Sequence, residues 1–430
     1  MKNNFKYIAV SLIFALFFSA CSQKEIKKEQ IEAYKPPVDV VFELSKYAKD
    51  DFLDQEISTN AFLEKFFIPW KQNKLSYTAQ DAAWGVSYKN RKVYLENHKL
   101  ASPEWFDKLI ANANFENYNQ DIRKAITIKN SDVRVLPTSS PFFYNPKLPG
   151  EGFPFDYNQN SRLKMNTPLI VSHLSQDKAW AYIESYFVGG WVKVDDIAFV
   201  DDAFINTFQT KDYYISTKEK FPLYDPNFVE YVKIGTLFPK YNSGFLIAKK
   251  DEKSNVKLIQ IQIENNQVEK LPIKNSTENR TRILNELLDE PYGWGGLLNN
   301  RDCSSFTQDY FAVFGKYLDR NSKAQSRNGN YVDLSFMNLN EKKEYIAKNG
   351  VPFSTLVYLK GHIMLYIGVK NGEPLVAHNV WSIRLKDKNQ EEFRHIIGKA
   401  TITTLEPGIE LEGFTNESNI LGKVLGITIL

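Results

Sequence analysis

The sequence has 430 residues and a formal net charge of +3, with 54 Lys and Arg against 51 Asp and Glu. It contains no block of like charges, which excludes the basic footprint of a nucleic-acid-binding protein. At ~150 residues per domain the length predicts about three domains, and an aromatic content of 14% favours β-rich modules with well-filled cores.

The N-terminus has the pattern of an export signal. Two lysines precede an uncharged run over residues 7–20, which ends in small residues directly before Cys21. The run is shorter than the ~20 residues of a spanning helix, so residues 1–21 are predicted to be a signal peptide. The end of the run resembles a bacterial lipobox, which would make Cys21 the lipidated residue of an exported, membrane-anchored lipoprotein facing the periplasm or cell envelope. The alternative is a secreted protein with a free Cys21. Polar residues 22–45 suit a flexible tether.

Residues 46–124 are predicted to form a small helical cap without a catalytic signal. Phe62 and Phe66 are four residues apart and belong to an amphipathic stripe, and Pro103 suits a first helical turn.

Two strand-rich modules follow the cap. Residues 125–202 contain short strands, a Pro- and Gly-rich loop over 146–156 and a late Gly-Trp strand ending near Val192, and they look like a bacterial SH3-like barrel. Residues 203–272 include a cleanly alternating strand but no Gly-Trp mark, and are expected to form a second barrel of the same type.

The last block, residues 273–430, has an α+β pattern with helices at 281–288 and 303–314 and strands from 356 onward. Asp302 is a good N-cap residue, which places Cys303 in the first turn of the second helix. There the helix dipole favours a thiolate and can bring a cysteine pKa into the range ~3.5–7.5 when a cation is also near.

Cys303 is the only cysteine besides Cys21, so a lipidated chain can form no intrachain disulfide. An unpaired thiol in an exported protein indicates a function. The competing interpretation is a buried structural cysteine.

Two histidines downstream fit nucleophilic cysteine catalysis of amide-bond cleavage. His362 opens an apolar strand, where a lone histidine is more often a core residue, and His378 ends the next strand. A strict two-residue turn at 371–372 would put them on opposite faces, whereas an odd-length loop or a bulge would restore a common face. The hairpin is predicted to centre on Lys370, with His362 directly opposite His378. His362 would then take the thiol proton and protonate the leaving amine, while His378 fixes its tautomer.

Five short motifs together resemble the NlpC-type cell-wall cysteine peptidases; they lie at residues 292–296, 302–304, 321–325, 361–368 and 378–379. More narrowly, the chain resembles the γ-D-glutamyl-diaminopimelate endopeptidases that carry bacterial SH3-like domains before the catalytic domain. The resemblance implies a multidomain fold: a helical cap, two SH3-like β barrels and a C-terminal α+β, papain-like cysteine peptidase domain. It also implies peptidoglycan stem peptides as substrate.

The resemblance assigns roles to individual residues. Catalysis falls to Cys303 as nucleophile, His362 as base and His378 as the orienting third member. Substrate binding falls to Asp302, Ser304, Ser322 and Trp294. Asp302 would bind the free ammonium of an N-terminal L-Ala in a pocket narrowed by the first barrel, for which Tyr186 and Arg134 are candidates. One departure is Ser305, which stands where the family usually has Gly and could alter a subsite.

Two other functions stay open: a non-catalytic wall-binding lipoprotein that acts through its barrels, and a thiol acyltransferase of the same fold that uses an amine acceptor. No cofactor is expected. The remaining histidines are isolated and none has metal-ligand spacing, so no metal is expected either; they are His98, His173 and His395. The chain is expected to act as a monomer, without a nucleic-acid partner.

Overall fold

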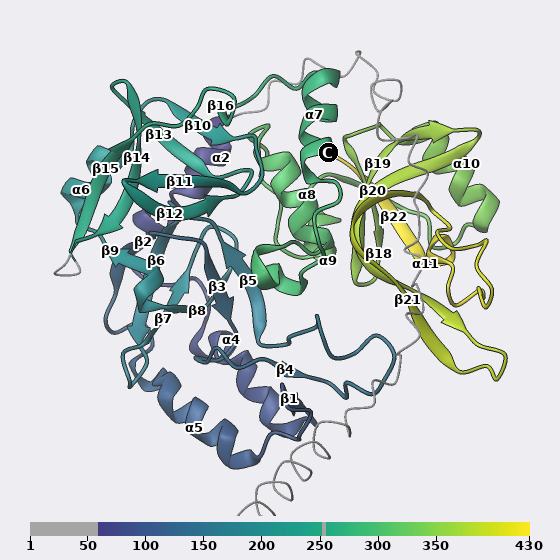
Figure 1. Ribbon diagram of the computed structural model, residues 1–430, viewed down its shortest axis with the longest axis horizontal. Coiled ribbons are helices and arrows are strands. Elements are labelled where there is room, and N and C mark those ends of the chain that lie inside the picture. The colour runs from purple at the N-terminus through teal and green to yellow at the C-terminus, as the bar shows by residue number, and fades with distance from the viewer. Residues whose placement is uncertain (1–58, 252–254) are drawn as a thin grey trace, which may run out of the picture. The chain divides into compact units, whose positions relative to one another are not determined.

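The computed structural model describes residues 59–251 and 255–430 (Figure 1), which lie in one compact unit of the chain. The predicted signal peptide, Cys21, the tether 22–45 and the first part of the cap lie outside the described residues. In the part of the chain that is described, no helix has both the length and the apolar character to cross a bilayer.

Short helices make up most of residues 59–117. They are α2 (Thr59–Phe66), α3 (Ile68–Lys71), α4 (Ala79–Ala82), η3 (Trp84–Asn90), α5 (Pro103–Ala113) and η4 (Phe115–Asn117). A two-residue strand, β1 (Tyr94–Leu95), pairs with β4 (Phe142–Phe143) of the next module. Ser102 caps α5 with its side chain, and Pro103 occupies the first turn as predicted. The stripe of Phe62 and Phe66 is buried, and the indole N–H of Trp70 donates to the carbonyl of Ala125, 2.8 Å away.

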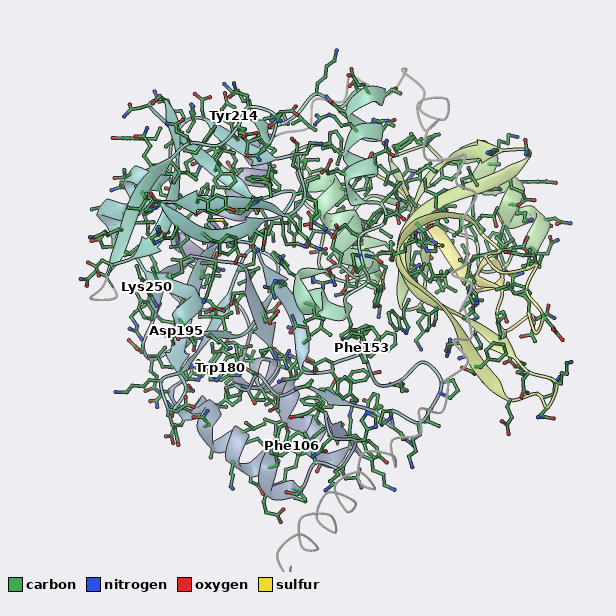
Figure 2. The ribbon with its side chains drawn as sticks, in the orientation of Figure 1. Phe106, Phe153, Trp180, Asp195, Tyr214 and Lys250 are labelled. Atoms are coloured by element: carbon green, nitrogen blue, oxygen red, sulfur yellow. The ribbon has the colours of Figure 1, made fainter. Side chains whose placement is uncertain are left out.

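The next module is an antiparallel seven-stranded sheet in the order β5-β3-β8-β7-β6-β2-β9. Its strands are β2 (Arg123–Thr127), β3 (Ser131–Arg134), β5 (Gln159–Leu163), β6 (Pro168–Leu174), β7 (Trp180–Glu184), β8 (Gly189–Lys193) and β9 (Ile197–Phe199). Trp191 of the predicted Gly-Trp strand is fully buried. The long loop between β4 and β5 carries Phe153, labelled in Figure 2, whose ring centroid lies 6.2 Å from that of Trp381 in the C-terminal domain.

After α6 (Asp202–Phe208) comes a second strand-rich module. Its strands are β10 (Tyr213–Ser216), β11 (Phe221–Asp225), β12 (Asn227–Val232), β13 (Leu237–Tyr241), β14 (Gly244–Lys250), β15 (Val256–Ile261) and β16 (Val268–Lys270). Five of them form one sheet in the order β15-β14-β13-β10-β16, and β11 and β12 form a separate hairpin. Phe221, Phe238 and Phe245 pack between them. The module is β-rich as expected, and its assignment as a second barrel stays a prediction.

The C-terminal domain packs helices against a six-stranded antiparallel sheet, β17-β22-β18-β19-β20-β21. The helices are α7 (Thr277–Leu287), η6 (Trp294–Asn299), α8 (Cys303–Ala312), α9 (Ser322–Gln325), α10 (Leu339–Asn349) and α11 (Ile420–Lys423). The strands are β17 (Asn330–Asp333), β18 (Thr355–Leu359), β19 (His362–Lys370), β20 (Glu373–Lys386), β21 (Glu392–Thr404) and β22 (Val424–Ile429). The sequence missed β17 and α10, and it began α7 four residues late. Helix α8 packs against β19 and β20 (Figure 1), which brings its first turn to the strands that carry the histidines.

The prediction that His362 lies directly opposite His378 is wrong. The hairpin closes on the two-residue turn 371–372 instead of centring on Lys370, and a β-bulge follows Tyr366. The extra residue of the bulge restores a common face for the two histidines, which become diagonal neighbours across the strands.

A buried network of charges joins the two strand-rich modules to the C-terminal domain. Arg301, which is 1% exposed, pairs through its two terminal nitrogens with Glu219 at 2.9 and 2.7 Å and through Nε with Asp309 at 2.6 Å. Asp309 also pairs with Lys164, and Glu219 pairs with Lys233 at 3.1 Å. Burial alone would raise the pKa of Glu219, but Arg301 and Lys233 hold it well below its ordinary value. The charged groups of this network are therefore desolvated, and each is stabilised by the opposite charges of its neighbours.

Replacing Glu219 by Ala is expected to lower the free energy of unfolding by about 3 kcal/mol, because it leaves buried cations short of a counter-charge. Asp289 pairs with Lys399 at the surface, with 73% of its side chain exposed, and provides the matched control. The Asp289→Ala variant is expected to lose less than about 1 kcal/mol. Urea denaturation of both variants measures the difference, and equal losses would contradict the structural role of the network.

Candidate active site

The first turn of α8 is fixed by a reciprocal capping box. The Asp302 carboxylate accepts a hydrogen bond from the backbone N–H of Ser305 at 2.8 Å, and the Ser305 hydroxyl accepts one from the backbone N–H of Asp302 at 2.9 Å. Ser305 does not line the main cavity. The residue that departs from the family pattern therefore stabilises the start of the helix that presents Cys303.

Replacing Ser305 by Gly is expected to lower the free energy of unfolding by about 1–2 kcal/mol, because the capping hydroxyl is lost and Gly is a poor helix former. The kcat/KM for peptide hydrolysis is expected to stay within about twofold of wild type, since the Ser305 hydroxyl stabilises the helix cap and takes no part in the reaction. Denaturant titration and steady-state kinetics measure the two effects. A loss of activity without a loss of stability would instead place Ser305 in a subsite.

The Cys303 thiol is 8% exposed at the N-terminal end of α8. Burial raises its pKa to about 12, and the nearby negative charge of Asp302 adds to the rise, whereas the backbone N–H of Ile363 opposes it. The expectation of a low thiol pKa is therefore wrong for the free protein, because the helix dipole is outweighed by loss of water and by the adjacent carboxylate. The resting nucleophile is a neutral thiol that needs a base.

A chain of hydrogen bonds orients that base. His362 Nε2 lies 2.8 Å from His378 Nδ1, and His378 Nε2 lies 3.0 Å from the hydroxyl oxygen of Thr403. The Thr403 hydroxyl donates its own hydrogen to the carbonyl of Thr404 at 2.7 Å. Thr403 must therefore accept from His378 Nε2–H, so His378 Nδ1 accepts from His362 Nε2–H. This leaves the Nδ1 lone pair of His362 free to take a proton.

Both histidines are neutral at pH 7. Burial lowers the pKa of His362 to about 4, although the charge of Asp302 partly opposes this. Burial and the neighbouring His362 hold the pKa of His378 well below its ordinary value. A neutral imidazole is the form that a general base requires.

The depressed pKa of His362 predicts an unusual pH profile. The imidazole stays neutral until the pH falls towards about 4, so kcat/KM for hydrolysis is expected to hold down to about pH 5 instead of falling near the usual ~6.5. The unfolded chain binds protons on these histidines between pH 6.5 and 4 while the folded chain does not, so stability decreases as pH falls through that window. Circular dichroism at each pH separates this loss from catalysis. A fall in kcat/KM near pH 6.5 while the protein remains folded would contradict the assignment of the buried His362 as the base.

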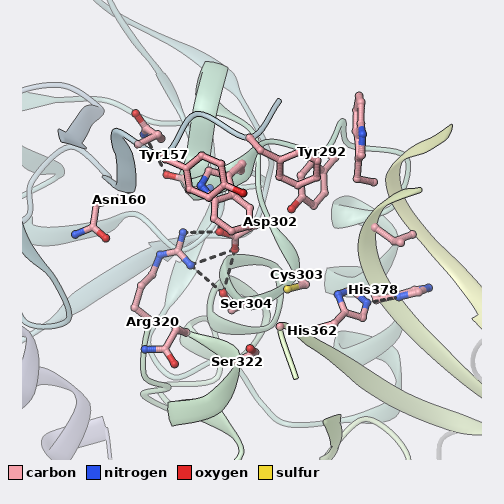
Figure 3. A pocket seen from close by; sticks show the side chains of 18 of the residues that line it. Tyr157, Asn160, Tyr292, Asp302, Cys303, Ser304, Arg320, Ser322, His362 and His378 are labelled. Atoms are coloured by element: carbon pink, nitrogen blue, oxygen red, sulfur yellow. Dashed lines mark hydrogen bonds and ion pairs between the residues drawn. The ribbon is translucent and has the colours of Figure 1, made fainter. Parts of the chain in front are cut away.

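The side chains converge on a cavity of about 940 Å³, hereafter the active-site cavity (Figure 3). All seven residues that the sequence singled out in the C-terminal domain line it: Cys303, His362, His378, Asp302, Ser304, Ser322 and Trp294. Trp294 belongs to a loop whose Gly295 has a φ of +59° and packs so tightly that an added Cβ would lie 2.5 Å from the carbonyl oxygen of Gln159. Only glycine fits there, which fixes the Trp294 loop against the first strand-rich module.

Both first-module candidates fall outside the cavity. Arg134 is 4% exposed and pairs with Asp156 at 2.8 Å. Tyr186 packs its ring 5.1 Å from that of Phe66. Neither lines the active-site cavity, and both serve packing between elements.

Apart from Trp294, the sequence missed the aromatic wall of the cavity, which crosses the modules. Ring-centroid distances of 5.4–6.4 Å link successive side chains from the cap to β20: Trp84, Tyr88, Tyr157, Trp294, Phe155 and Trp381. These residues come from four separate segments of sequence, so no local pattern marks them as neighbours. The long loop over 146–156 was the available signal, because long loops in compact domains are often functional.

Arg320 is another residue that the sequence missed, and it pairs with Asp302. Its guanidinium contacts both Asp302 oxygens, with Nη2–Oδ2 at 2.7 Å and Nη1–Oδ1 at 3.1 Å (Figure 3). Burial would raise the pKa of Asp302, but Arg320 and hydrogen bonds from Ser305 lower it below its ordinary value. The carboxylate that was expected to meet a substrate ammonium already has a buried counter-ion.

Three family models match parts of the sequence, and several solved structures resemble the chain. Residues 10–118 match the NLPC_P60 stabilising domain, N-terminal, residues 141–193 match an SH3 domain of the SH3b1 type, and residues 289–394 match the NlpC/P60 family. The structure of an NlpC/P60 endopeptidase from Photobacterium damselae subsp. piscicida is 26% identical, covers 90% of this chain and 96% of its own, and superposes with a TM-score of 0.82. An NlpC/P60 family protein from Bacillus cereus is 14% identical over 71% of this chain and 98% of its own, with a TM-score of 0.44. No curated protein matches the sequence.

Proposed function

The chain carries a C-terminal NlpC/P60 domain behind an N-terminal stabilising domain and an SH3 domain, and from this premise we propose that it hydrolyses the amide bond between γ-D-Glu and diaminopimelate in peptidoglycan stem peptides. The observation that carries the proposal is the hydrogen-bonded series His362–His378–Thr403, whose two histidines line the cavity that also holds Cys303. A neutral base beside a neutral thiol is the resting state of an activated nucleophile.

The reaction proceeds in two halves. His362 Nδ1 takes the proton from Cys303, and the sulfur attacks the γ-carbonyl carbon of D-Glu to form a tetrahedral intermediate. The dipole at the N-terminal end of α8 favours its negative oxygen. The intermediate collapses as His362 protonates the leaving amine of diaminopimelate, and the C–N bond breaks. A water that gives its proton to His362 then cleaves the thioester, which releases the D-Glu carboxylate and restores the thiol.

The proposal places this reaction at the cell envelope. Residues 7–20 and Cys21 support export with a lipid anchor on Cys21. A Cys21→Ser variant that stays in the membrane fraction would contradict the anchor and leave the enzymatic proposal intact.

Product analysis tests the proposed bond. The full-length protein is incubated with L-Ala-γ-D-Glu-diaminopimelate, with its N-acetylated form and with the α-linked D-Glu isomer, and the products are identified by mass spectrometry. Release of diaminopimelate from the γ-linked peptides only is expected. Cleavage at another bond would contradict the specificity. Transfer to an added amine without hydrolysis would favour an acyltransferase, and inertness of the folded, reduced protein would favour a wall-binding role.

A further inference from the structure

Asp302 has no hydrogen-bonding capacity to spare for a substrate ammonium. One carboxylate oxygen accepts hydrogen bonds from Ser304, Ser305 and Arg320, and the other accepts from Arg320 and from the backbone N–H of Gly295 at 3.1 Å. An arriving ammonium would displace these bonds and would meet the positive charge of Arg320 at the same point. The pair is neutral as it stands, and a third charge beside it would be unfavourable.

Arg320 is held in this position by both domains that flank the cavity. Its Nε donates to the Ser161 hydroxyl of β5 at 2.7 Å, and its Nη1 donates to the Ser304 hydroxyl at 2.9 Å. Only 12% of its side chain is exposed. The contacts with Ser161 and Ser304 fix the guanidinium plane, so the ion pair with Asp302 is part of the built site and not a mobile surface contact.

Two other carboxylates, Glu184 and Asp81, belong to the same region as the cap residue Tyr77 that lines the cavity. Glu184 does not line the cavity, and its carboxylate accepts hydrogen bonds from Ser76 and from the backbone of Tyr77. Of the described residues that line the cavity, Asp81 is the other carboxylate, on α4 in the cap, where it accepts from the Thr78 hydroxyl. The cationic lining residues outnumber the two carboxylates; they are Arg320, Arg384, Arg394 and Lys423. Arg320 pairs with Asp302, and Arg384 and Arg394 pair with Glu392. Among the described lining residues, a substrate ammonium would therefore find no carboxylate without a cationic partner other than Asp81.

Exposed aromatic rings of the cap also line the cavity. Tyr77 and Trp84 line it with 44% and 45% of their surfaces exposed. Tyr77 packs against the backbone of Gly189 in β8, where an added Cβ would lie 2.9 Å from the ring. Half-exposed aromatic faces beside a neutral subsite suit a bulky, uncharged group with apolar faces, such as a sugar ring.

We propose that this end of the cavity receives an N-acylated L-Ala, as in stem peptides still joined to their glycan, instead of a free N-terminal ammonium. The inference rests on the proposed function and specifies its substrate class. The acyl amide is uncharged, so it can lie beside the Asp302–Arg320 pair without repulsion. The sugar that follows it would lie on Tyr77 and Trp84.

Three peptides test the inference with the full-length protein: L-Ala-γ-D-Glu-diaminopimelate with a free N-terminus, with an N-acetyl group and with an N-acetylmuramoyl group. The wild-type kcat/KM is expected to be at least as high for the acetylated as for the free peptide, and highest for the muramoyl peptide. In Arg320→Met the Asp302 carboxylate loses its counter-ion and can pair with an ammonium. The ratio of kcat/KM for the free peptide to kcat/KM for the acetylated peptide is therefore expected to rise by at least about tenfold. Trp84→Ala is expected to lower kcat/KM for the muramoyl peptide about threefold to tenfold more than for the acetylated one.

The control for Trp84 is Phe228→Ala, which removes a 50% exposed aromatic ring that does not line the cavity and should change no ratio. A wild-type preference of tenfold or more for the free peptide would overturn the inference while the proposed function stands. If that preference disappeared in Asp81→Asn, Asp81 would be the ammonium receptor. Failure to cleave any of the three peptides would instead reject the proposed function. If Arg320→Met does not fold, the wild-type ratios and the Trp84 variant still decide the outcome.

Discussion

Replacing Cys303 by Ala is expected to abolish peptide hydrolysis, with a fall in kcat/KM of at least about 10⁴-fold, because the reaction loses its only nucleophile. The thiol contributes little to the fold, since the capping box of Asp302 and Ser305 is independent of it and Ala is the best helix former. Steady-state kinetics with the γ-linked peptide measures the loss, and denaturant titration checks that the variant remains folded.

Substrate binding should survive this substitution. A Cys303→Ala protein titrated with the peptide by calorimetry is expected to bind it with an affinity close to the wild-type KM, because the lining of the cavity is otherwise unchanged. Cys303→Ser supplies a second control, since a hydroxyl of higher pKa in the same place should also be almost inactive. Residual activity within about a hundredfold of wild type in either variant would reject Cys303 as the nucleophile.

Replacing His378 by Leu is expected to lower kcat by about 10²- to 10⁴-fold with little change in KM, because His362 then loses the acceptor that fixes its tautomer. His378 is fully buried, and Leu has a similar volume, so the strand should tolerate it. The reacting atoms are untouched by this change. A loss confined to kcat would therefore report on the orientation of the base.

Two further variants separate orientation from packing. In His378→Gln the amide oxygen can accept from His362 Nε2 and the amide nitrogen can donate to Thr403, so most of the activity should return. In Thr403→Val the end of the hydrogen-bond chain is removed, and a fall of about ten- to a hundredfold in kcat is expected, whereas Thr403→Ser should behave as wild type. Equal activity of the Leu and Gln variants would show that His378 fills space and does not orient His362.

The C-terminal domain was predictable to the extent that its chemistry is local. Asp302 as an N-cap, Cys303 in the first turn and His362 at the start of an apolar strand follow from short-range rules of helix capping and strand patterning. His378 was expected to end the next strand, but β20 continues to Lys386 and places His378 in the strand interior. Trp294, Ser304, Ser322 and the binding role of Asp302 came from the family resemblance, and all seven residues line one cavity. The hairpin register was mispredicted because a β-bulge depends on how β19 packs in the sheet, which the turn residues do not reveal.

The residues by which the first strand-rich module lines the active-site cavity were predicted less well. Arg134 and Tyr186 were chosen by residue type, but a buried ion pair with Asp156 and a ring cluster with Phe66 use both side chains elsewhere. The aromatic wall was missed because its members are far apart in sequence. Their neighbourhood exists only once the cap, the module and the C-terminal domain have packed together.

The sequence alone determined the family resemblance and the candidates for thiol and base, since these depend on residue type and on spacing within single helices and strands. The tertiary structure decided the charge state of the site. Burial raises the pKa of Cys303 to about 12 and lowers that of His362 to about 4, and Arg320 neutralises Asp302. Both effects arise from loss of water and from charges brought close by folding, and neither is encoded in any local stretch of residues.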